Sequence, residues 1–460
     1  MYLIPSTGKL LPIDKKRRLD EPFNKLKTTL DTVDVNFEKN IGEDWLLRGA
    51  YAFSRSKHEY GHIRLMNVNL NTGVAARRNE AYDGFIHRTH AGSLNLNGYV
   101  QTGEIEHNLL FGIDTKSYYR YRPGGLRDTG AHLNINIYNP IYGRVGLPTV
   151  REPGIQYQTL KTIGFYAQDS INLTENLIYS LGARYEFYRQ IARGTVSGPN
   201  STDQKDGKFT WQTGLLYLLT PEWSVYANDA QSFSPQMTMN GDIGDIKPEE
   251  GKSVELGTKF QNDSITASAA VFNIDKKNIM RTVNSVSTPV GEARSRGFEF
   301  DFNGRVTQGL SVGASYAYTK TEVRKDSGAF AVLVGKPLEA TPKHQASLFA
   351  NYDFSHLGAK GLRIGGGARY FGSWYTYYMR TNLPAVPAGT GFKMDDAVVY
   401  DAFISYDTKI AGYETNFAFN VKNLTDKLYY TSSSTGTQAN IIPIQPGYAR
   451  QFMLTASVKF

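Results

Sequence analysis

The last stretch of the chain reads Gly447-Tyr448-Ala449-Arg450-Gln451-Phe452-Met453-Leu454-Thr455-Ala456-Ser457-Val458-Lys459-Phe460. Read with a period of two, it is a strand with one apolar face, formed by Phe452, Leu454, Ala456, Val458 and Phe460. The closing strand of an outer-membrane barrel has such a face and ends on an aromatic residue that lies at the membrane interface. An amphipathic strand of a soluble β-sandwich has the same pattern, so this stretch alone leaves both folds open.

The composition fits a barrel whose strands alternate between lipid and water. Among the 460 residues, 13% are aromatic, with 30 Tyr, 24 Phe and 4 Trp, and the mean hydropathy is −0.40. No apolar run is long enough for a membrane helix, but alternating strands keep the mean hydropathy low. The absence of Cys removes disulfides, zinc–thiolate sites and thiol nucleophiles. The net charge of +8 comes from basic residues interspersed with acidic ones, so no nucleic-acid partner is expected.

The chain reads as strands joined alternately by tight turns and by long polar connections. Residues 177–190 show the cleanest alternation, with Leu, Tyr, Leu, Ala, Tyr and Phe on one face. Tight turns are predicted at 41–44, 102–104, 174–176, 220–222, 262–264, 307–309 and 411–412. Long connections are predicted at 57–83, 122–156, 195–207, 236–250, 325–340, 375–395 and 427–446. Short periplasmic turns and long extracellular loops are the layout of an outer-membrane barrel.

About seventeen strands of membrane length can be placed, whereas bacterial single-chain barrels have an even number. With an odd number, the first and last strands run parallel and an antiparallel ladder cannot close. We therefore expect a carboxy-terminal portion of a larger barrel. In this interpretation residues 1–26 are the remnant of an extracellular loop, residues 27–460 form a partial transmembrane barrel, and the sequence carries no export signal.

A series of motifs resembles the TonB-dependent siderophore receptors of Gram-negative outer membranes. The series covers nearly the whole chain, most clearly after Tyr157, and its members occur in the family's order and spacing. They are Gly164-Phe165-Tyr166-Ala167-Gln168-Asp169, Leu181-Gly182-Ala183-Arg184-Tyr185, Phe233-Ser234-Pro235, Ile246-Lys247-Pro248-Glu249-Glu250-Gly251, Glu255-Leu256-Gly257, Val271-Phe272-Asn273-Ile274, Arg294-Ser295-Arg296-Gly297-Phe298-Glu299, Gly335-Lys336-Pro337-Leu338, Pro342-Lys343-His344, Asn420-Val421-Lys422-Asn423-Leu424-Thr425-Asp426 and Phe460.

The resemblance implies an all-β, 22-stranded barrel with a plug domain at its amino-terminal end. It further implies uptake of a ferric siderophore, location in the outer membrane, and energy supplied by the TonB complex through a region ahead of the plug. This sequence shows neither the plug nor that region. Because iron arrives already chelated, no metal ligand or cofactor of the protein's own is expected. The partners expected are a ferric siderophore, outer-membrane lipid and, through the missing region, TonB.

Two clusters that combine aromatic and basic residues are candidate ligand contacts, because Tyr, Trp and Arg suit the apolar, oxygen-rich and often anionic surface of a ferric siderophore. The alternative is the aromatic girdle at the outer membrane interface. The first cluster is Tyr118, Tyr119 and Arg120, with Tyr138 and Tyr142 from the following loop. The second is Trp374, Tyr375, Tyr377 and Arg380. Phe460 is the candidate membrane-assembly signal.

No enzymatic site is predicted. His87 and His90 lie three apart on a predicted strand, which places them on opposite faces and argues against a metal site. Asp169, Glu186, Asp401 and Asp407 are expected to line a polar lumen. Gly365-Gly366-Gly367 lacks the setting of a phosphate loop, so strand packing explains it better.

Three other interpretations remain open. A general porin would be a complete, even-stranded barrel without these motifs. A soluble enzyme or lectin on a β scaffold would fractionate without detergent. A non-functional remnant of a truncated receptor is compatible with every pattern above.

Overall fold

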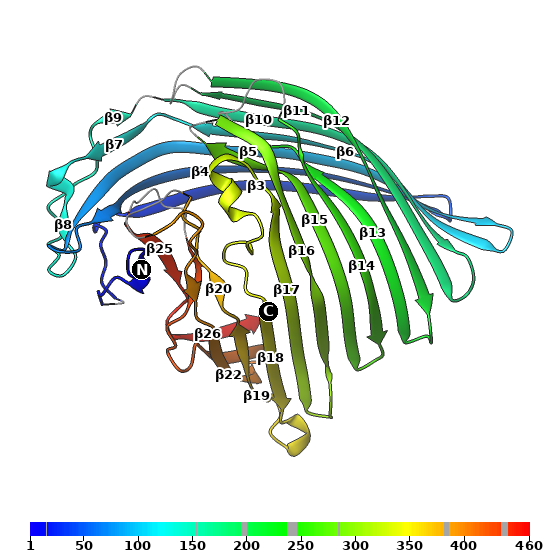
Figure 1. Cartoon of the computed structure of the whole chain (residues 1–460). Coiled ribbons are helices and arrows are strands. Elements are labelled where there is room, and N and C mark those ends of the chain that lie inside the picture. Colours follow the sequence, from blue (N-terminus) through cyan, green and yellow to red (C-terminus); the bar gives the residue numbers. More distant parts are fainter. Residues whose placement is uncertain are drawn as a thin grey trace.

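The computed structural model describes residues 1–14, 16–152, 154–194, 200–236, 246–283, 286–380, 386–433 and 440–460. In these residues, seventeen strands lie side by side, each antiparallel to its neighbours, in one strongly curved wall (Figure 1). The predicted fold class and strand count are therefore confirmed. The strands are β3 (Lys25–Ile41), β4 (Trp45–Val68), β5 (Val74–Thr102), β6 (Ile105–Arg122), β10 (Gln156–Asn172), β11 (Leu177–Gly194), β12 (Asn200–Leu218), β13 (Trp223–Ser234), β14 (Glu249–Gln261), β15 (Ile265–Val283), β16 (Val286–Arg305), β17 (Leu310–Lys325), β18 (His344–Asp353), β19 (Leu362–Phe371), β22 (Ala397–Ile410), β23 (Tyr413–Lys422) and β26 (Gln451–Lys459).

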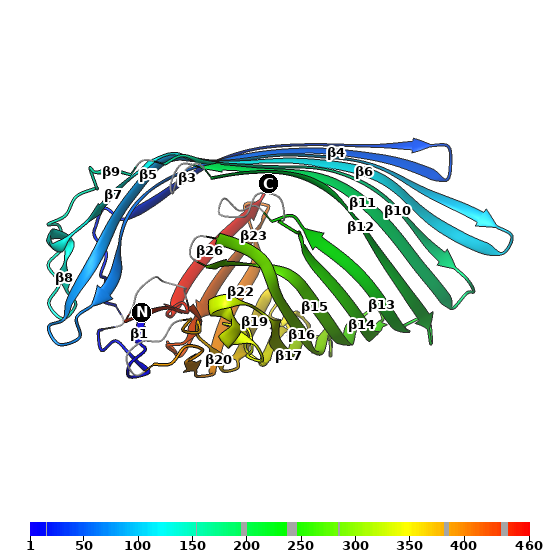
Figure 2. The ribbon, with the colours of Figure 1, turned by 45° about the horizontal axis from the view of Figure 1, so that its top comes forward.

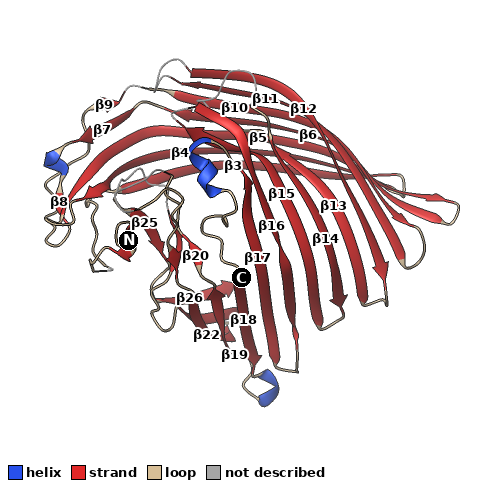
Figure 3. Ribbon diagram, in the orientation of Figure 1, coloured by secondary structure: helices blue, strands red, loops and turns tan. Residues whose placement is uncertain are grey.

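The remaining elements are short and belong to the amino-terminal segment and to the connections (Figure 3). A four-stranded sheet joins the amino-terminal segment to the last long connection in the order β2-β1-β25-β24. None of the described helices is long or apolar enough to cross a membrane. These elements are β1 (Tyr2–Ile4), β2 (Lys9–Leu10), β7 (Gly125–Thr129), η1 (Ala131–Leu133), β8 (Ile135–Asn136), β9 (Arg151–Glu152), η2 (Gly328–Leu333), η3 (Ser355–Leu357), β20 (Trp374–Tyr375), β21 (Lys393–Met394), β24 (Tyr430–Ser433) and β25 (Ile442–Pro446).

The turns at one end of the wall are tight, as predicted, and contain two to eight residues. At the other end, the predicted long connections lie partly outside the described residues, at 195–199, 237–245, 381–385 and 434–439. The stretch 57–83 was predicted as a long polar connection that contains a short hairpin around 64–74. A hairpin does turn there, but the predictions of connections at 57–63, 75–83 and 200–207 are wrong. β4 and β5 continue as one hairpin whose ladder reaches Val68 opposite Ala75, and β12 starts at Asn200. Above the membrane a strand needs no apolar face, so polar sequence can extend the ladder.

Alternation along the wall strands separates an apolar face from a polar face. In β11, Leu181, Tyr185 and Phe187 are 47%, 41% and 51% exposed, which places large apolar side chains on the surface. On the opposite face Arg184 donates to Asp114 of β6 at 2.6 Å. A soluble protein buries its apolar side chains and exposes its charged ones. This wall has the opposite arrangement, so its apolar face is the outer, lipid-facing one.

The glycine run Gly365-Gly366-Gly367 lies in β19, between β18 and β22. A Cβ at Gly367 would lie 2.5 Å from the carbonyl oxygen of Leu348, and one at Gly365 would lie 2.8 Å from that of Ala350. Close approach of the strands requires glycine at these positions, as the packing interpretation predicted.

The first and last strands of the wall are its two edges. β3 is paired with β4, and β26 is paired with β23, and every residue of both strands is exposed. Because neighbours are antiparallel and the wall strands are odd in number, β3 and β26 run in the same direction. Figure 2 shows them lying apart. Unpaired backbone groups in lipid cost several kcal/mol each, so two open edges are energetically unfavourable in a membrane.

The amino-terminal segment packs among the long connections rather than in the wall. Residues 1–26 were predicted as the remnant of an extracellular loop; in the structure β1 forms a ladder with β2 and with β25. Its apolar residues enter a buried cluster with the β4–β5 hairpin and the connection after β6. This cluster contains Ile4, Leu11, Leu19, Leu65, Val68, Ala75, Ile135, Ile137 and Ile441.

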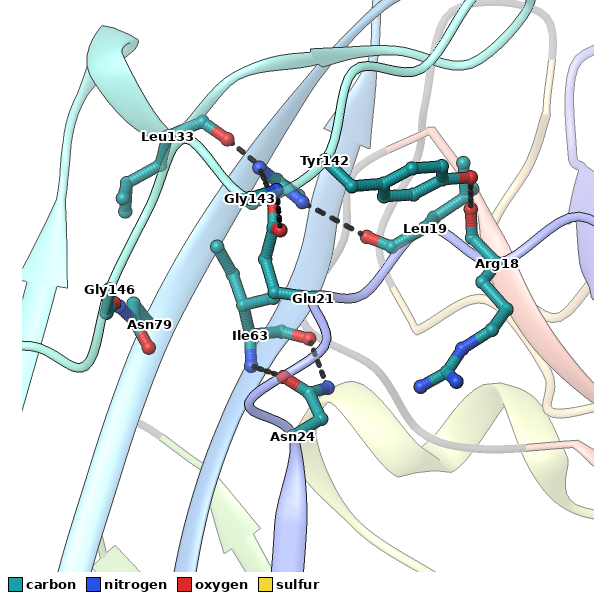
Figure 4. Close-up of polar contacts among 11 residues, drawn as sticks. Arg18, Leu19, Glu21, Asn24, Ile63, Asn79, Leu133, Tyr142, Gly143 and Gly146 are labelled. Carbon is teal, nitrogen blue, oxygen red and sulfur yellow. Dashed lines mark hydrogen bonds and ion pairs between the residues drawn. The ribbon is translucent and has the colours of Figure 1, made fainter.

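An ion pair ties the same segment to the hairpin (Figure 4). Arg77 of β5 lies 2.8 Å from Glu21, and both side chains are buried. Arg77 also donates to the carbonyl of Leu133 at 2.6 Å, while Glu21 accepts from the backbone N–H of Gly143 at 2.8 Å. This pair therefore joins three separate stretches of chain.

Candidate functional site

Only candidate residues on the polar inner face of the wall can contact a ligand inside the barrel. Phe111 of β6 is 43% exposed on the outer face, so the odd-numbered residues of this regular strand face outward. Tyr118 and Arg120 consequently lie on the inner face, whereas Tyr119 lies on the outer face. The first predicted cluster is therefore divided between the lumen and the exterior.

The inner members of this cluster make specific contacts. The hydroxyl of Tyr118 lies 2.8 Å from Nδ1 of His87, and Arg120 donates to the side-chain carbonyl of Gln158 at 2.9 Å. The guanidinium of Arg120 also stacks over Phe85 at 5.0 Å from the ring centroid. An aromatic and cationic surface of this kind can bind an anionic, partly apolar ligand.

Tyr138 and Tyr142 lie far from Tyr118. Tyr138 is close to Gly73 at the tip of the β4–β5 hairpin. Thr89, the β5 partner of Tyr118, is sixteen residues along the strand from Gly73, about 50 Å at about 3.3 Å per residue. Tyr142 donates to the carbonyl of Arg18 at 2.7 Å (Figure 4). The structure does not bring these two tyrosines together with the rest of the first cluster.

The second predicted cluster has a buried part and an accessible part. Trp374 is 3% exposed, donates to the carbonyl of Tyr430 at 3.2 Å and packs with Leu3, Ile442 and Ile444. Tyr375 is 38% exposed and stacks on Tyr378, a largely buried residue. Trp374 therefore belongs to the core of the loops and cannot touch a ligand in this conformation.

Arg380 lies at the centre of a stack of aromatic and cationic groups. Its guanidinium carbon is 4.0 Å from the ring centroid of Phe330 and 4.6 Å from that of Tyr377. Arg281 covers Phe330 at 5.0 Å and pairs with the buried carboxylate of Asp326 at 2.8 Å. Among the described residues, Nε of Arg380 is buried and has no hydrogen-bond partner.

Burial sets the electrostatics of the stack. Desolvation lowers the pKa of Arg380 and raises that of Tyr377. Burial also raises the pKa of Glu339, while a hydrogen bond from the backbone N–H of Tyr378 opposes the shift. The stack therefore offers cationic donors beside a carboxyl group that resists ionisation.

Three residues around Arg380 were not predicted from the sequence: Arg281 of β15, Phe330 of η2 and Glu339 of the connection after η2. No local pattern marks them, because their proximity to Arg380 arises only on folding. His87 contacts Tyr118 on the inner face of the wall, whereas His90 lies 2.9 Å from the hydroxyl of Tyr51 on the outer face. The prediction that the two histidines lie on opposite faces of the strand is therefore confirmed.

The acidic residues are paired with cations. Asp401 and Asp407 lie beside Arg369 and Arg363, and Glu186 beside Arg184, all on the inner face. The lumen prediction is wrong for Asp169, which pairs with His107 at 2.7 Å on the outer face of β10, in phase with Phe165. Within the described residues, no cluster of His, Asp and Glu could hold a metal ion.

Phe460 lies at the end of the wall that carries the tight turns. It is 96% exposed and its ring contacts Tyr413, at 5.5 Å between ring centroids. This is the height at which an interfacial aromatic residue is expected.

Comparisons with known proteins agree with this architecture. A family model described as TonB dependent receptor-like, beta-barrel matches residues 7–424. An uncharacterized TonB-dependent receptor of Haemophilus influenzae is 41% identical over 344 residues, covering 73% of this chain and 97% of that protein. The ferrichrome outer membrane transporter/phage receptor of Escherichia coli is 31% identical over 498 residues, covering 99% of this chain and 63% of that protein.

Solved structures resemble the chain in fold. The siderophore receptor PiuA from Acinetobacter baumannii has a TM-score of 0.82 at 20% identity, covering 99% of this chain and 68% of that one. The ferric-catecholate import receptor Fiu of Escherichia coli has a TM-score of 0.81 at 23% identity, with the same coverage. The chain thus spans about two thirds of the length of these receptors.

Proposed function

The chain belongs to the TonB-dependent receptor family of outer-membrane β-barrels, and from this premise we propose that it takes part in the uptake of a ferric siderophore. Support comes from relatives whose names specify ferrichrome and, at 28% identity, a metal–pseudopaline complex. The family transports rather than catalyses, so no reaction is assigned to the chain.

The observation that carries the proposal is the stack of Arg281, Phe330 and Arg380 at the loop end of the wall. Ferric siderophores expose oxygen atoms and often carry negative charge, and guanidinium groups bind such surfaces in a fixed geometry. Arg380, which is partly exposed, is the proposed first contact, through the guanidinium nitrogens other than its buried Nε. Tyr118 and Arg120, on the inner face, are proposed to receive the complex next.

The TonB complex is proposed as the source of energy. The family model that matches this chain describes the β-barrel, so the contact with TonB is assigned to a part of the receptor outside these 460 residues. Lipid is the partner of the apolar outer face.

The proposal is tested by titrating the full chain, purified in detergent, with a panel of ferric hydroxamate, catecholate and carboxylate siderophores. Quenching of Tyr and Trp fluorescence reports binding. The variant Arg380→Gln removes one charge and is expected to weaken binding about ten- to a hundredfold, since a hydrogen bond to a charged group contributes about 1.5–3 kcal/mol.

Arg450→Gln is the matched control, because Arg450 also stacks on an aromatic ring, that of Phe452, but in the connection immediately before β26. It should leave affinity unchanged. The proposal is wrong if no complex in the panel binds, or if the two variants bind the preferred complex equally well.

A further inference from the structure

A pair of like charges lies on the outer face of the wall, directly above the apolar band. In the ladder between β16 and β17, Phe298 is opposite Tyr318, and the next outward pair toward the loop end is Arg296 opposite Lys320. Phe298, Phe300 and Tyr316 are 38%, 36% and 36% exposed and mark the lipid-facing side. Arg296 and Lys320 are in phase with them and are also exposed.

The position corresponds to the headgroup level of a bilayer. Below it, Phe302, Phe300 and Phe298 follow one another at every second position of β16, and the band ends where Arg296 begins. Aromatic residues mark the boundary between hydrocarbon and headgroups, so the side chains just beyond them meet the polar part of the lipid.

Neither cation has a carboxylate partner in the part of the chain that the structure describes. Like charges directly opposite each other in a sheet are destabilising. The neighbouring cations differ in this respect: Arg294 pairs with Asp275 at 2.6 Å, and Arg324 pairs with Glu322 at 3.0 Å. An anion placed between Arg296 and Lys320 would relieve the repulsion and accept hydrogen bonds from both.

A charged groove of about 620 Å³ extends the same surface toward the loop end. Its cations outnumber its carboxylates by six to three, so its net charge is also positive. Lys277, an exposed lysine of β15, has no ion pair among the described residues either. The charged lining of the groove consists of Lys208, Lys252, Lys276, Lys277, Arg294, Arg324, Glu250, Asp275 and Glu292.

We propose that Arg296 and Lys320 bind a phosphate group of a lipid in the outer leaflet, with the groove above them receiving the rest of its polar headgroup. The acyl chains of the same lipid lie along Phe298, Phe300 and Tyr316. A phosphate presents several oxygens that can bridge a guanidinium and an ammonium group. A lipid is favoured over a free anion because the charged pair adjoins the apolar band and each cation near a membrane surface adds attraction for anionic lipid.

The test uses the full chain purified in an uncharged detergent. Micelles containing lipid A with both phosphates, the same lipid with its phosphates removed, or inorganic phosphate alone are titrated in, and binding is measured by calorimetry. The variant carries Arg296→Gln and Lys320→Gln. Its control carries Lys360→Gln and Lys409→Gln, two exposed lysines at the tight-turn end, and has the same change in net charge.

The expected result is that the phosphorylated lipid binds the parent chain and the control alike and binds the variant about a hundredfold more weakly, about tenfold for each cation lost. The dephosphorylated lipid should bind all three equally weakly. The proposal is overturned if the variant binds the phosphorylated lipid as the parent does. It is also overturned if removal of the phosphates has no effect, or if inorganic phosphate binds as tightly as the lipid. Because this site lies on the exterior, its failure would leave the siderophore proposal untouched.

Discussion

Replacement of Arg77 by Ala should release the amino-terminal segment from the β4–β5 hairpin. The side chains of Arg77 and Glu21 are 1% and 0% exposed, so the variant leaves a carboxylate buried without its cation. Breaking one partner of a buried pair costs about 3–5 kcal/mol. At about 1.4 kcal/mol for each factor of ten, the open form of the segment should become roughly 150 to 4,000 times more populated.

Hydrogen exchange measures this opening directly. The amide of Leu11 donates to Tyr2, and that of Ile444 donates to Met1, so both are protected only while the small sheet is formed. Both amides exchange when the amino-terminal segment opens locally, so in Arg77→Ala their exchange should be roughly 150 to 4,000 times faster. Amides in the middle of the wall should be unaffected.

The exposed pair of Arg18 and Asp20 supplies a control. Its side chains are 66% and 31% exposed, and surface pairs contribute about 0–1 kcal/mol, so Arg18→Ala should accelerate exchange less than about tenfold. Combining Arg77→Met with Glu21→Gln should restore much of the protection, because no buried charge remains and the amide oxygen still accepts from Gly143. Equal exchange in Arg77→Ala and Arg18→Ala would refute the reasoning.

Three further predictions concern the loops and the wall. Trp374→Ala should destabilise the loop cluster by about 3–5 kcal/mol, measured by urea unfolding followed through loop-specific exchange, whereas a ligand-only role would leave stability unchanged. Burial raises the pKa of Glu339 in the folded chain, so folding favours its protonated form, and the loops should lose stability as pH rises from about 4.5 through that raised pKa. Hydrogen exchange of the loop amides, measured as a function of pH, reports this loss. Glu339→Gln keeps an acceptor for the backbone N–H of Tyr378 and should abolish the loss. Gly297→Ala places a Cβ against the carbonyl of Tyr318 and should cost about 1–3 kcal/mol in urea unfolding, while Gly313→Ala, with open space around it, should not.

Much of the wall could be predicted from sequence because alternation is a local property. The apolar positions of residues 177–190 lie two apart, and the structure exposes Leu181, Tyr185 and Phe187 on one face. The tight turns followed from short polar breaks between such segments. The odd number of strands, and hence the parallel direction of the edges, followed from counting alone.

The upper parts of the hairpins could not be predicted in the same way. Where β4 and β5 pass beyond the apolar band, neither face needs to be apolar, and the alternation on which the prediction rests disappears. Polar sequence is then compatible with either a loop or a ladder. Hydrogen bonding to the neighbouring strand decides between them, and that partner is distant in sequence.

The candidate sites were likewise predictable only where they depend on residues close together in the sequence. That Tyr118 and Arg120 share a face, with Tyr119 opposite, is implied by their spacing, but which face is the lumen depends on the curvature of the wall. Trp374 looks like a surface aromatic in sequence, yet residues near 3 and near 442 bury it. Such contacts join segments separated by hundreds of residues, and no local pattern records them.

The sequence by itself determined an antiparallel wall of alternating strands, its tight and long ends, and its place among outer-membrane receptors, because each depends on the period and order of nearby residues. Only the tertiary structure decided which distant side chains meet: Arg380 with Phe330, Arg77 with Glu21, Arg296 with Lys320. The physical reason is that strand register and loop packing are set by contacts across the wall, where hydrogen bonding and burial fix the neighbours that chain order leaves free.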